Sequence, residues 1–138
     1  MRTRAALVPE FYVRDTEKSR TFYVDLLGFD VLFERPEEGF IYLCREGAEL
    51  MLDAIGTGRS WLAADAEVPF GRGVSLQIWT EDVNALYERV KAANANVFMN
   101  IEEKWYRRDN DFFGNRQFIV QDPDGYLLRF AQDIGQRR

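Results

Sequence analysis

The 138-residue sequence contains no histidine and only one cysteine. A metal site built from imidazole ligands is therefore excluded, and so is an internal disulfide. Cys44 lies at the end of the apolar stretch 40–44, which favours a free thiol in the core over a redox role.

Long hydrophobic segments and an excess of positive charge are also missing. No apolar run approaches the ~18 residues of a membrane span, and the few apolar residues before Pro9 are too short for the core of a signal peptide. We therefore expect a cytoplasmic protein with no membrane partner. The net charge of −5 argues against a nucleic-acid partner. It suits a cationic small ligand, although an effect on solubility alone explains it equally well.

The pattern of strand and helix signals occurs twice in what the length indicates is a single domain, 1–138. In the first half we expect strands over 7–13, 29–34, 40–44 and 48–53, and a helix over 17–27. In the second half we expect strands over 74–80, 97–100, 117–121 and 127–132, and a helix that begins at Asp82 and ends at 94–96. Segment 54–72 connects the halves.

Local signals support these boundaries. Asp15 or Thr16 can cap the first helix, and Gly28 stands where a left-handed C-terminal residue is needed. Short polar turns follow at 45–47 and at Asp122–Gly125. The predicted fold class is α+β, with two βαβββ modules over about 7–53 and 74–132 that form a curved mixed sheet with a concave cavity.

Alternation along the strands separates two faces of the predicted sheet. An apolar face suits packing under the helices and contains Leu50, Leu52, Val74, Leu76, Ile78, Leu128 and Phe130. The opposite face mixes polar and large side chains and contains Glu49, Met51, Asp53, Ser75, Gln77, Trp79 and Arg129. A ligand-lining surface has this mixed character.

Several motifs in order resemble one family. They are Val13-Arg14-Asp15, Thr21-Phe22-Tyr23, Leu27-Gly28-Phe29, Glu81-Asp82-Val83 and Gln121–Tyr126. Together they resemble the vicinal-oxygen-chelate superfamily of glyoxalases, extradiol dioxygenases and bleomycin-resistance proteins, and the likeness runs from about residue 7 to 133. Asp-Pro-Asp-Gly on its own is only a turn.

The resemblance implies a metal site in the enzymes of the superfamily, held by His and Glu on four inner strands. The matching positions here are Val8, Met51, Ser75 and Arg129. None of these side chains is a suitable ligand for a divalent cation. We therefore expect no metal, no cofactor and no catalytic residue. Glu10, Glu49 and Asp53 share the open face and could hold an oxygen-loving ion, but loosely spaced carboxylates are usually solvated or paired.

The absence of metal ligands fits the bleomycin-resistance branch. The resemblance implies a homodimer that binds its drug stoichiometrically, and Val8-Pro9 matches the start of an N-terminal arm exchanged between subunits. A simple edge-strand proline explains Pro9 equally well.

In that branch aromatic rings on a strand and on a loop enclose the planar part of the drug. The matching positions are Phe40 and Phe113, the latter followed by Gly114, and either ring could instead belong to the core. Trp105 and Tyr106 lie in a predicted loop that forms a cavity rim or packs on a second subunit. Asp53 and Glu38 could neutralise a cationic tail. The expected ligand-binding residues are Phe40, Asp53, Trp79, Trp105, Tyr106, Phe113 and Gly114.

Three alternatives remain open. The first is an enzyme of the same superfamily, either metal-dependent or using Glu10, Tyr12 or Arg129 for acid–base chemistry. The second is a receptor for a different planar or hydrophobic antibiotic or metabolite. The third is a structural dimer without a ligand.

Overall fold

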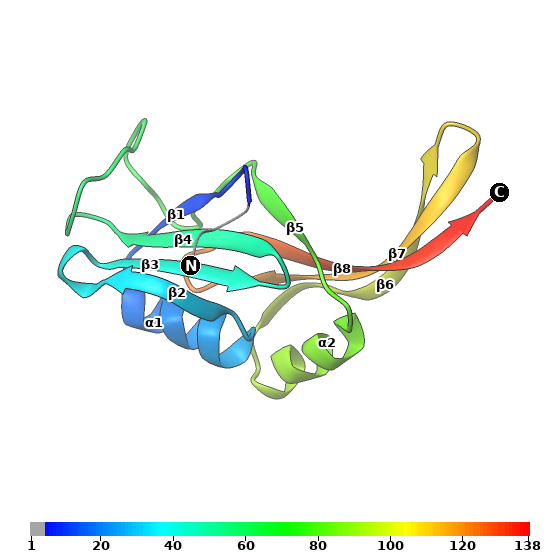
Figure 1. The fold of residues 1–138 in the computed structure, drawn as a ribbon, viewed down its shortest axis with the longest axis horizontal. Coiled ribbons are helices and arrows are strands. Elements are labelled where there is room, and N and C mark those ends of the chain that lie inside the picture. Colours follow the sequence, from blue (N-terminus) through cyan, green and yellow to red (C-terminus); the bar gives the residue numbers. More distant parts are fainter. Residues whose placement is uncertain (1–4) are drawn as a thin grey trace. The chain divides into compact units, whose positions relative to one another are not determined.

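A computed structural model of the protein describes residues 5–138 (Figure 1). The chain forms two compact units, Met1–Phe70 and Gly71–Arg138. Each unit contains one four-stranded mixed sheet with helical segments on one face, so the predicted α+β class is confirmed. No helix among the described residues is long and apolar enough to cross a membrane.

The first unit has the strand order β1-β4-β3-β2. Its strands are β1 (Glu10–Val13), β2 (Asp30–Arg35), β3 (Phe40–Arg45) and β4 (Ala48–Ala54). β1 pairs in parallel with β4, whereas β3 pairs antiparallel with both β4 and β2. The first strand is shorter than predicted, because residues 7–9 precede β1, although the carbonyl of Pro9 still accepts a hydrogen bond from the amide of Met51 at 2.9 Å.

The predicted helix over 17–27 begins as an α-helix and continues as a π-helix. α1 covers Thr16–Arg20, and η1 covers Thr21–Leu26. Asp15 is the cap, and its carboxylate accepts hydrogen bonds from the amides of Glu17 at 2.9 Å and Lys18 at 3.3 Å. The predicted helix is therefore confirmed to within one residue at each end, and the change from α to π geometry within it was not predicted. The π turns bury the adjacent rings of Phe22 and Tyr23, which pack edge-to-face at 5.1 Å.

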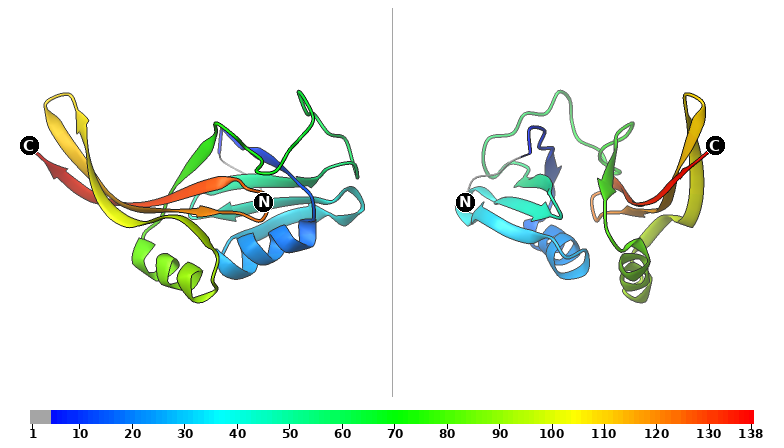
Figure 2. Two further views of the ribbon diagram at one scale, coloured as in Figure 1. Left: turned by 180° about the vertical axis from the view of Figure 1, so that it is seen from behind. Right: turned by 45° about the vertical axis from the view of Figure 1, so that its right-hand side comes forward.

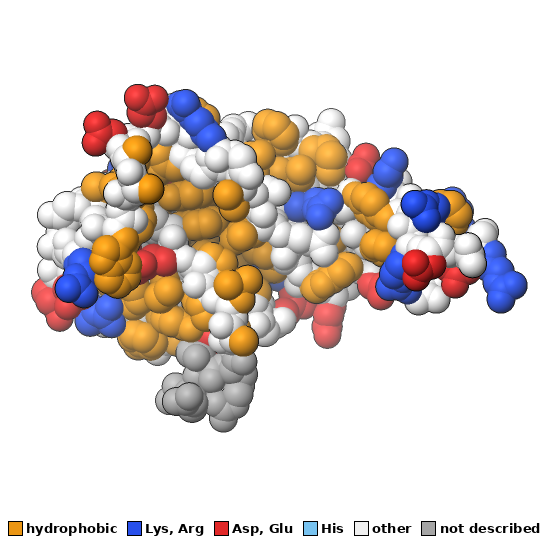
Figure 3. Space-filling model, turned by 90° about the horizontal axis from the view of Figure 1, so that it is seen from above, with side chains coloured by type: hydrophobic (Ala, Val, Ile, Leu, Met, Phe, Trp, Pro, Cys, Tyr) orange, Lys and Arg blue, Asp and Glu red, His pale blue; other side chains and the backbone are white. Residues whose placement is uncertain are grey.

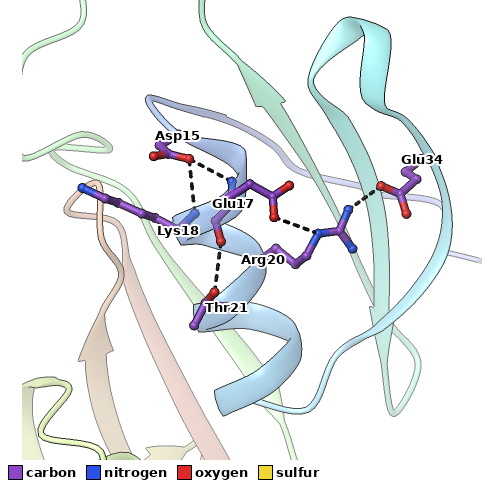
Figure 4. Close-up of polar contacts among 6 residues, drawn as sticks. All are labelled: Asp15, Glu17, Lys18, Arg20, Thr21 and Glu34. Atoms are coloured by element: carbon purple, nitrogen blue, oxygen red, sulfur yellow. Dashed lines mark hydrogen bonds and ion pairs between the residues drawn. The ribbon is translucent and has the colours of Figure 1, made fainter.

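Polar contacts attach α1 to its sheet. Arg20 forms an ion pair with Glu34 of β2 and a second with Glu17 at 3.7 Å, while the hydroxyl of Thr21 donates to the carbonyl of Glu17 (Figure 4). Gly28 ends the helical segment with φ of 84°, as the C-terminal signal predicted. A tight turn then joins β3 and β4 with positive φ at Glu46 and Gly47, again as predicted. The short helix η2 (Pro36–Glu38) joins β2 to β3.

The second unit has the strand order β5-β8-β7-β6 (Figure 2). Its elements are β5 (Ser75–Trp79), α2 (Val83–Ala92), β6 (Asn96–Arg108), β7 (Asp111–Gln121) and β8 (Leu127–Arg137). Asp82 caps α2 by accepting from the amide of Ala85 at 3.0 Å. The turn at Asp122–Gly125 is confirmed: one carboxylate oxygen of Asp122 accepts from three successive amides, each at 2.9 Å.

The last three strands are much longer than predicted. The prediction of a loop at 102–108 was wrong, because these residues belong to β6, and Phe113 lies in β7 rather than in a loop. Cross-strand contacts explain the difference. Glu103 forms an ion pair with Arg116 at 2.6 Å, and the rings of Tyr106 and Phe113 stack at 5.6 Å.

The predicted division of the sheets into two faces is confirmed in both units. The face toward the helical segments is apolar and buried, and includes Phe11, Ile41, Leu43, Leu50 and Leu52 in the first unit and Ile78, Phe118, Val120, Leu128 and Phe130 in the second. Val74 is an exception, since it precedes β5 and is 60% exposed. The opposite faces, called the open faces below, contain the candidate site residues.

Candidate functional site

The open face of the first unit carries two rows of side chains that cross all four strands. Strand pairing aligns Tyr12, Asp53, Phe40 and Arg35 in one row. The other row is Glu10, Met51, Tyr42 and Phe33. These eight residues combine four aromatic rings with two carboxylates. We call them the acidic aromatic face.

The aromatic rings of this face are in contact. Phe33 stacks on Tyr42 with 5.0 Å between centroids and an interplanar angle of 20°, and it also contacts Phe40 at 6.0 Å. Phe33 is 46% exposed, whereas Phe40 and Tyr42 are buried. The guanidinium of Arg35 lies 4.0 Å from the centre of the Phe40 ring. Phe33 therefore presents more ring surface to a ligand than the predicted Phe40, whose ring is already in contact with the guanidinium of Arg35.

Asp53 is the buried carboxyl group of the face. The pKa of Asp53 is raised to about 6. Burial is the largest cause, and the negative charge of Glu10 and a hydrogen bond with Glu10 add to it. Glu38 acts in the same direction, and Arg35 opposes it. A bound cation beside Asp53 would favour the ionised form.

The segment that follows β4 contacts the edge of the acidic aromatic face through Trp61. The phenol oxygen of Tyr12 accepts a hydrogen bond from the amide of Trp61 at 2.9 Å, and its hydroxyl donates to Glu10 at 3.4 Å. Trp61 itself is 67% exposed. Seen from the side opposite to α1, the surface of the first unit shows gathered hydrophobic side chains with acidic groups among them (Figure 3).

Cys44 lies on the open face rather than in the core, which corrects the sequence-based interpretation. The thiol is half-buried and is not in a disulfide. Burial and the charges of Asp30 and Glu49 raise its pKa. The protonated thiol is a weak nucleophile.

The positions implied as metal ligands do not suit a metal ion. Met51, Ser75 and Arg129 lie on open faces, and Val8 precedes β1. Among residues 5–138, no group of three or more His, Cys, Asp or Glu side chains is arranged to hold a metal ion. Two of the carboxylates considered for an oxygen-loving ion also have neighbours: Glu49 accepts from Tyr42 at 2.6 Å and from the amide of Ala5 at 3.2 Å, and Glu10 accepts from Tyr12.

The predicted ligand residues of the second unit fall into two groups. Tyr106 and Phe113 stack on each other, on the open face. Trp105 points to the other side of β6, where its ring covers Gly114 and where Arg137 lies 4.1 Å from the ring centre. Trp105 and Tyr106 therefore cannot line the same side of a ligand cavity. Trp79 is on the open face of β5 and is 51% exposed.

Phe33, Arg35 and Tyr42 were missed by the sequence analysis. Alternation along 29–34 and 40–44 places Phe33 and Tyr42 on the same face once the two strands are paired in register. The register itself was not predicted, and it contains an irregularity between Val31 and Phe33. A bulge of this kind shifts the alternation by one residue.

Comparisons with known proteins agree with this fold. A family model described as Glyoxalase/Bleomycin resistance protein/Dioxygenase superfamily matches residues 6–130. A bleomycin resistance protein of Geobacillus stearothermophilus is 28% identical over 137 residues, covering 92% of this chain and 96% of the relative. A bleomycin resistance protein of Staphylococcus aureus is similar to the same extent.

Two solved structures have the same fold at lower identity. TioX from Micromonospora sp. ML1 has a TM-score of 0.72 at 23% identity, covering 95% of this chain and 100% of its own. A lactoylglutathione lyase from Agrobacterium tumefaciens has a TM-score of 0.61 at 18% identity, covering 95% and 96%. The same fold therefore occurs in a protein named as an enzyme, the lyase, and in TioX.

Proposed function

Because the chain belongs to the Glyoxalase/Bleomycin resistance protein/Dioxygenase superfamily, we propose that it is a metal-free binding protein that sequesters bleomycin or a similar planar cationic antibiotic. Resistance then follows from stoichiometric binding. The curated relatives named bleomycin resistance protein support this proposal. We further propose that the protein acts as a cytoplasmic homodimer.

The acidic aromatic face is the observation that carries the proposal. A planar ring can stack on the exposed part of Phe33, beside Tyr42. Glu10 and Asp53 supply negative charge for a cationic group on the same molecule. The hydrocarbon, thioether, hydroxyl and guanidinium at the implied metal-ligand positions also favour binding without metal catalysis.

Calorimetric titration of the purified full chain with metal-free bleomycin tests the proposal. We expect saturable binding of about one drug molecule per chain, and mass spectrometry of the recovered drug should show no chemical change. Failure to bind bleomycin would reject the proposed ligand.

A superfamily enzyme is the second candidate, favoured by the fold shared with a lactoylglutathione lyase. Elemental analysis of the purified protein, followed by assays with added Ni²⁺, Zn²⁺, Fe²⁺ and Mn²⁺, separates the two. A stoichiometric metal together with turnover of a small substrate would support the enzyme.

A further inference from the structure

The guanidinium of Arg129 is held on the open face of the second unit by neutral groups. Its Nη2 donates to the side-chain oxygen of Gln77 at 2.5 Å, and its Nη1 donates to the phenol oxygen of Tyr106 at 3.3 Å. No carboxylate in the part of the chain that the structure describes forms an ion pair with it. By contrast, Arg20, Arg35, Arg45 and Arg116 each pair with a glutamate.

Gln117 fixes the direction of the Tyr106 hydroxyl. The buried amide of Gln117 donates to the phenol oxygen at 2.7 Å and to Glu102 at 3.0 Å. The phenol oxygen therefore accepts from both Gln117 and Arg129. Because both of these contacts use its acceptor capacity, its own O–H remains a donor.

The side chains of this hydrogen-bonded group come from three strands. Gln77 belongs to β5, Arg129 to β8 and Tyr106 to β6, and pairing places Gln77 directly beside Arg129. A guanidinium has five N–H donors in a planar fork. The described residues use two of the five donors of Arg129, so further donors remain for a ligand.

We propose that Arg129 and Tyr106 form a binding site for an anionic oxygen group, a carboxylate or a phosphate, of a small ligand. The rigid fork of Arg129 matches the two oxygens of such a group, and the Tyr106 O–H adds a third donor. The exposed Trp79, two residues beyond Gln77 on the same face of β5, lies where an aromatic ring attached to the group can make contact. This site goes beyond the proposed function, which concerns a cationic group on the first unit.

Titration of the full chain with benzoate and with phenyl phosphate tests this site, with neutral benzamide as the matched probe. We expect saturable binding of at least one of the anions, a shift of the Arg129 Nε–Hε resonance in the ¹⁵N spectrum, and no saturation with benzamide. The preferred anion tells a carboxylate ligand from a phosphate ligand.

Variants locate the binding. We expect R129Q to weaken binding of the anion at least tenfold and Y106F to weaken it about threefold to fivefold. R107Q is the control, since it removes the same charge from an exposed position on β6. Within residues 5–138 the Arg107 guanidinium donates a hydrogen bond to the backbone carbonyl of Asp109 and forms no ion pair. R107Q should leave the affinity unchanged.

Three results would overturn the inference: no saturation with either anion, equal losses in R129Q and R107Q, or unchanged affinity in folded R129Q. If R129Q does not fold, the affinity for the anion is measured in Y106F and R129K instead. Wild-type affinity in both variants would reject the site. Because these probes carry no cation, bleomycin binding can succeed or fail independently of them.

Discussion

At the scale of single residues, the raised pKa of Asp53 predicts that the stability of the protein depends on pH. The pKa of Asp53 is raised to about 6, whereas an unfolded aspartate titrates near ~3.9. The folded state therefore holds more protons than the unfolded state between these values. The free energy of unfolding should fall as the pH rises through this window.

Asp53→Asn should remove this pH dependence. At pH 7.5 we expect the variant to be more stable than the wild type by on the order of 1–2 kcal/mol, with the difference vanishing near pH 4. Urea unfolding at a series of pH values measures the effect. Glu37→Gln, at an exposed carboxyl that is not among the groups acting on Asp53, is the control and should retain the fall in stability. A wild type whose stability does not change from pH 4 to 7 would contradict the assignment.

Phe33 is the residue through which stacking on the acidic aromatic face can be tested. Phe33→Ala should weaken binding of bleomycin by roughly 2–10-fold, as expected for loss of one aromatic pair worth ~0.5–1.5 kcal/mol. Its effect on stability should be small because the ring is 46% exposed. Phe98→Ala, at a similarly exposed ring in the second unit, should leave the affinity unchanged. Equal losses in the two variants would place the drug elsewhere.

Residue-scale prediction from the sequence succeeded where alternation alone was sufficient. Asp53 was placed on the open face because Leu50 and Leu52 had to point toward the helices. Phe40 was placed on the same face, but its burial under Arg35 depends on pairing between β2 and β3, which the sequence does not encode as a local pattern. Contacts across strands therefore had to come from the structure.

At the scale of elements, β6 and β7 show why the length of a strand is hard to predict. Residues 102–108 combine charged and aromatic residues without the apolar alternation of a core strand. They remain in a strand because their partners lie opposite them on β7, as in the pair Glu103–Arg116. Helix α2, by contrast, has a local cap at Asp82 and a regular apolar stripe, and was predicted nearly to its ends.

Because Gly114 has no side chain, the ring of Trp105 on β6 can pack directly against the backbone of β7. A Cβ at this position would lie 2.8 Å from the Trp105 ring and from the side chain of Ile134. Gly114→Ala should therefore destabilise the protein by about 1–3 kcal/mol through overpacking. Gly58→Ala, where the nearest atom would be at 3.4 Å, is the control and should change the free energy of unfolding by less than about 0.5 kcal/mol. Urea unfolding compares the two, and an equal effect would reject the close approach.

At the scale of the whole molecule, the proposed homodimer can be tested together with the two explanations of Pro9, an exchanged N-terminal arm and a simple edge-strand proline. Pro9 directly precedes β1, where a proline limits the freedom of the unfolded chain and lacks the N–H that could donate to a neighbouring strand. We expect light scattering to give twice the chain mass at micromolar concentration, and Pro9→Ala to raise the monomer fraction. A dimer whose stability is unaffected by Pro9→Ala would favour the edge-strand explanation, and a monomeric wild type would reject the dimer.

Ligand binding should also be visible as a change in the stability of the entire protein. A ligand that binds only the native state at a concentration of 100 times Kd adds about 2.7 kcal/mol to the free energy of unfolding. For a chain of this length, the melting temperature should rise by roughly 5–10 °C with saturating bleomycin. The rise should grow with the logarithm of the drug concentration, and it should shrink as the pH falls below about 6, where Asp53 becomes protonated. In Asp53→Asn the rise should be smaller and independent of pH in this range. A structural dimer without a ligand predicts no change with any bleomycin, so the thermal shift decides directly between a receptor and an assembly without a ligand.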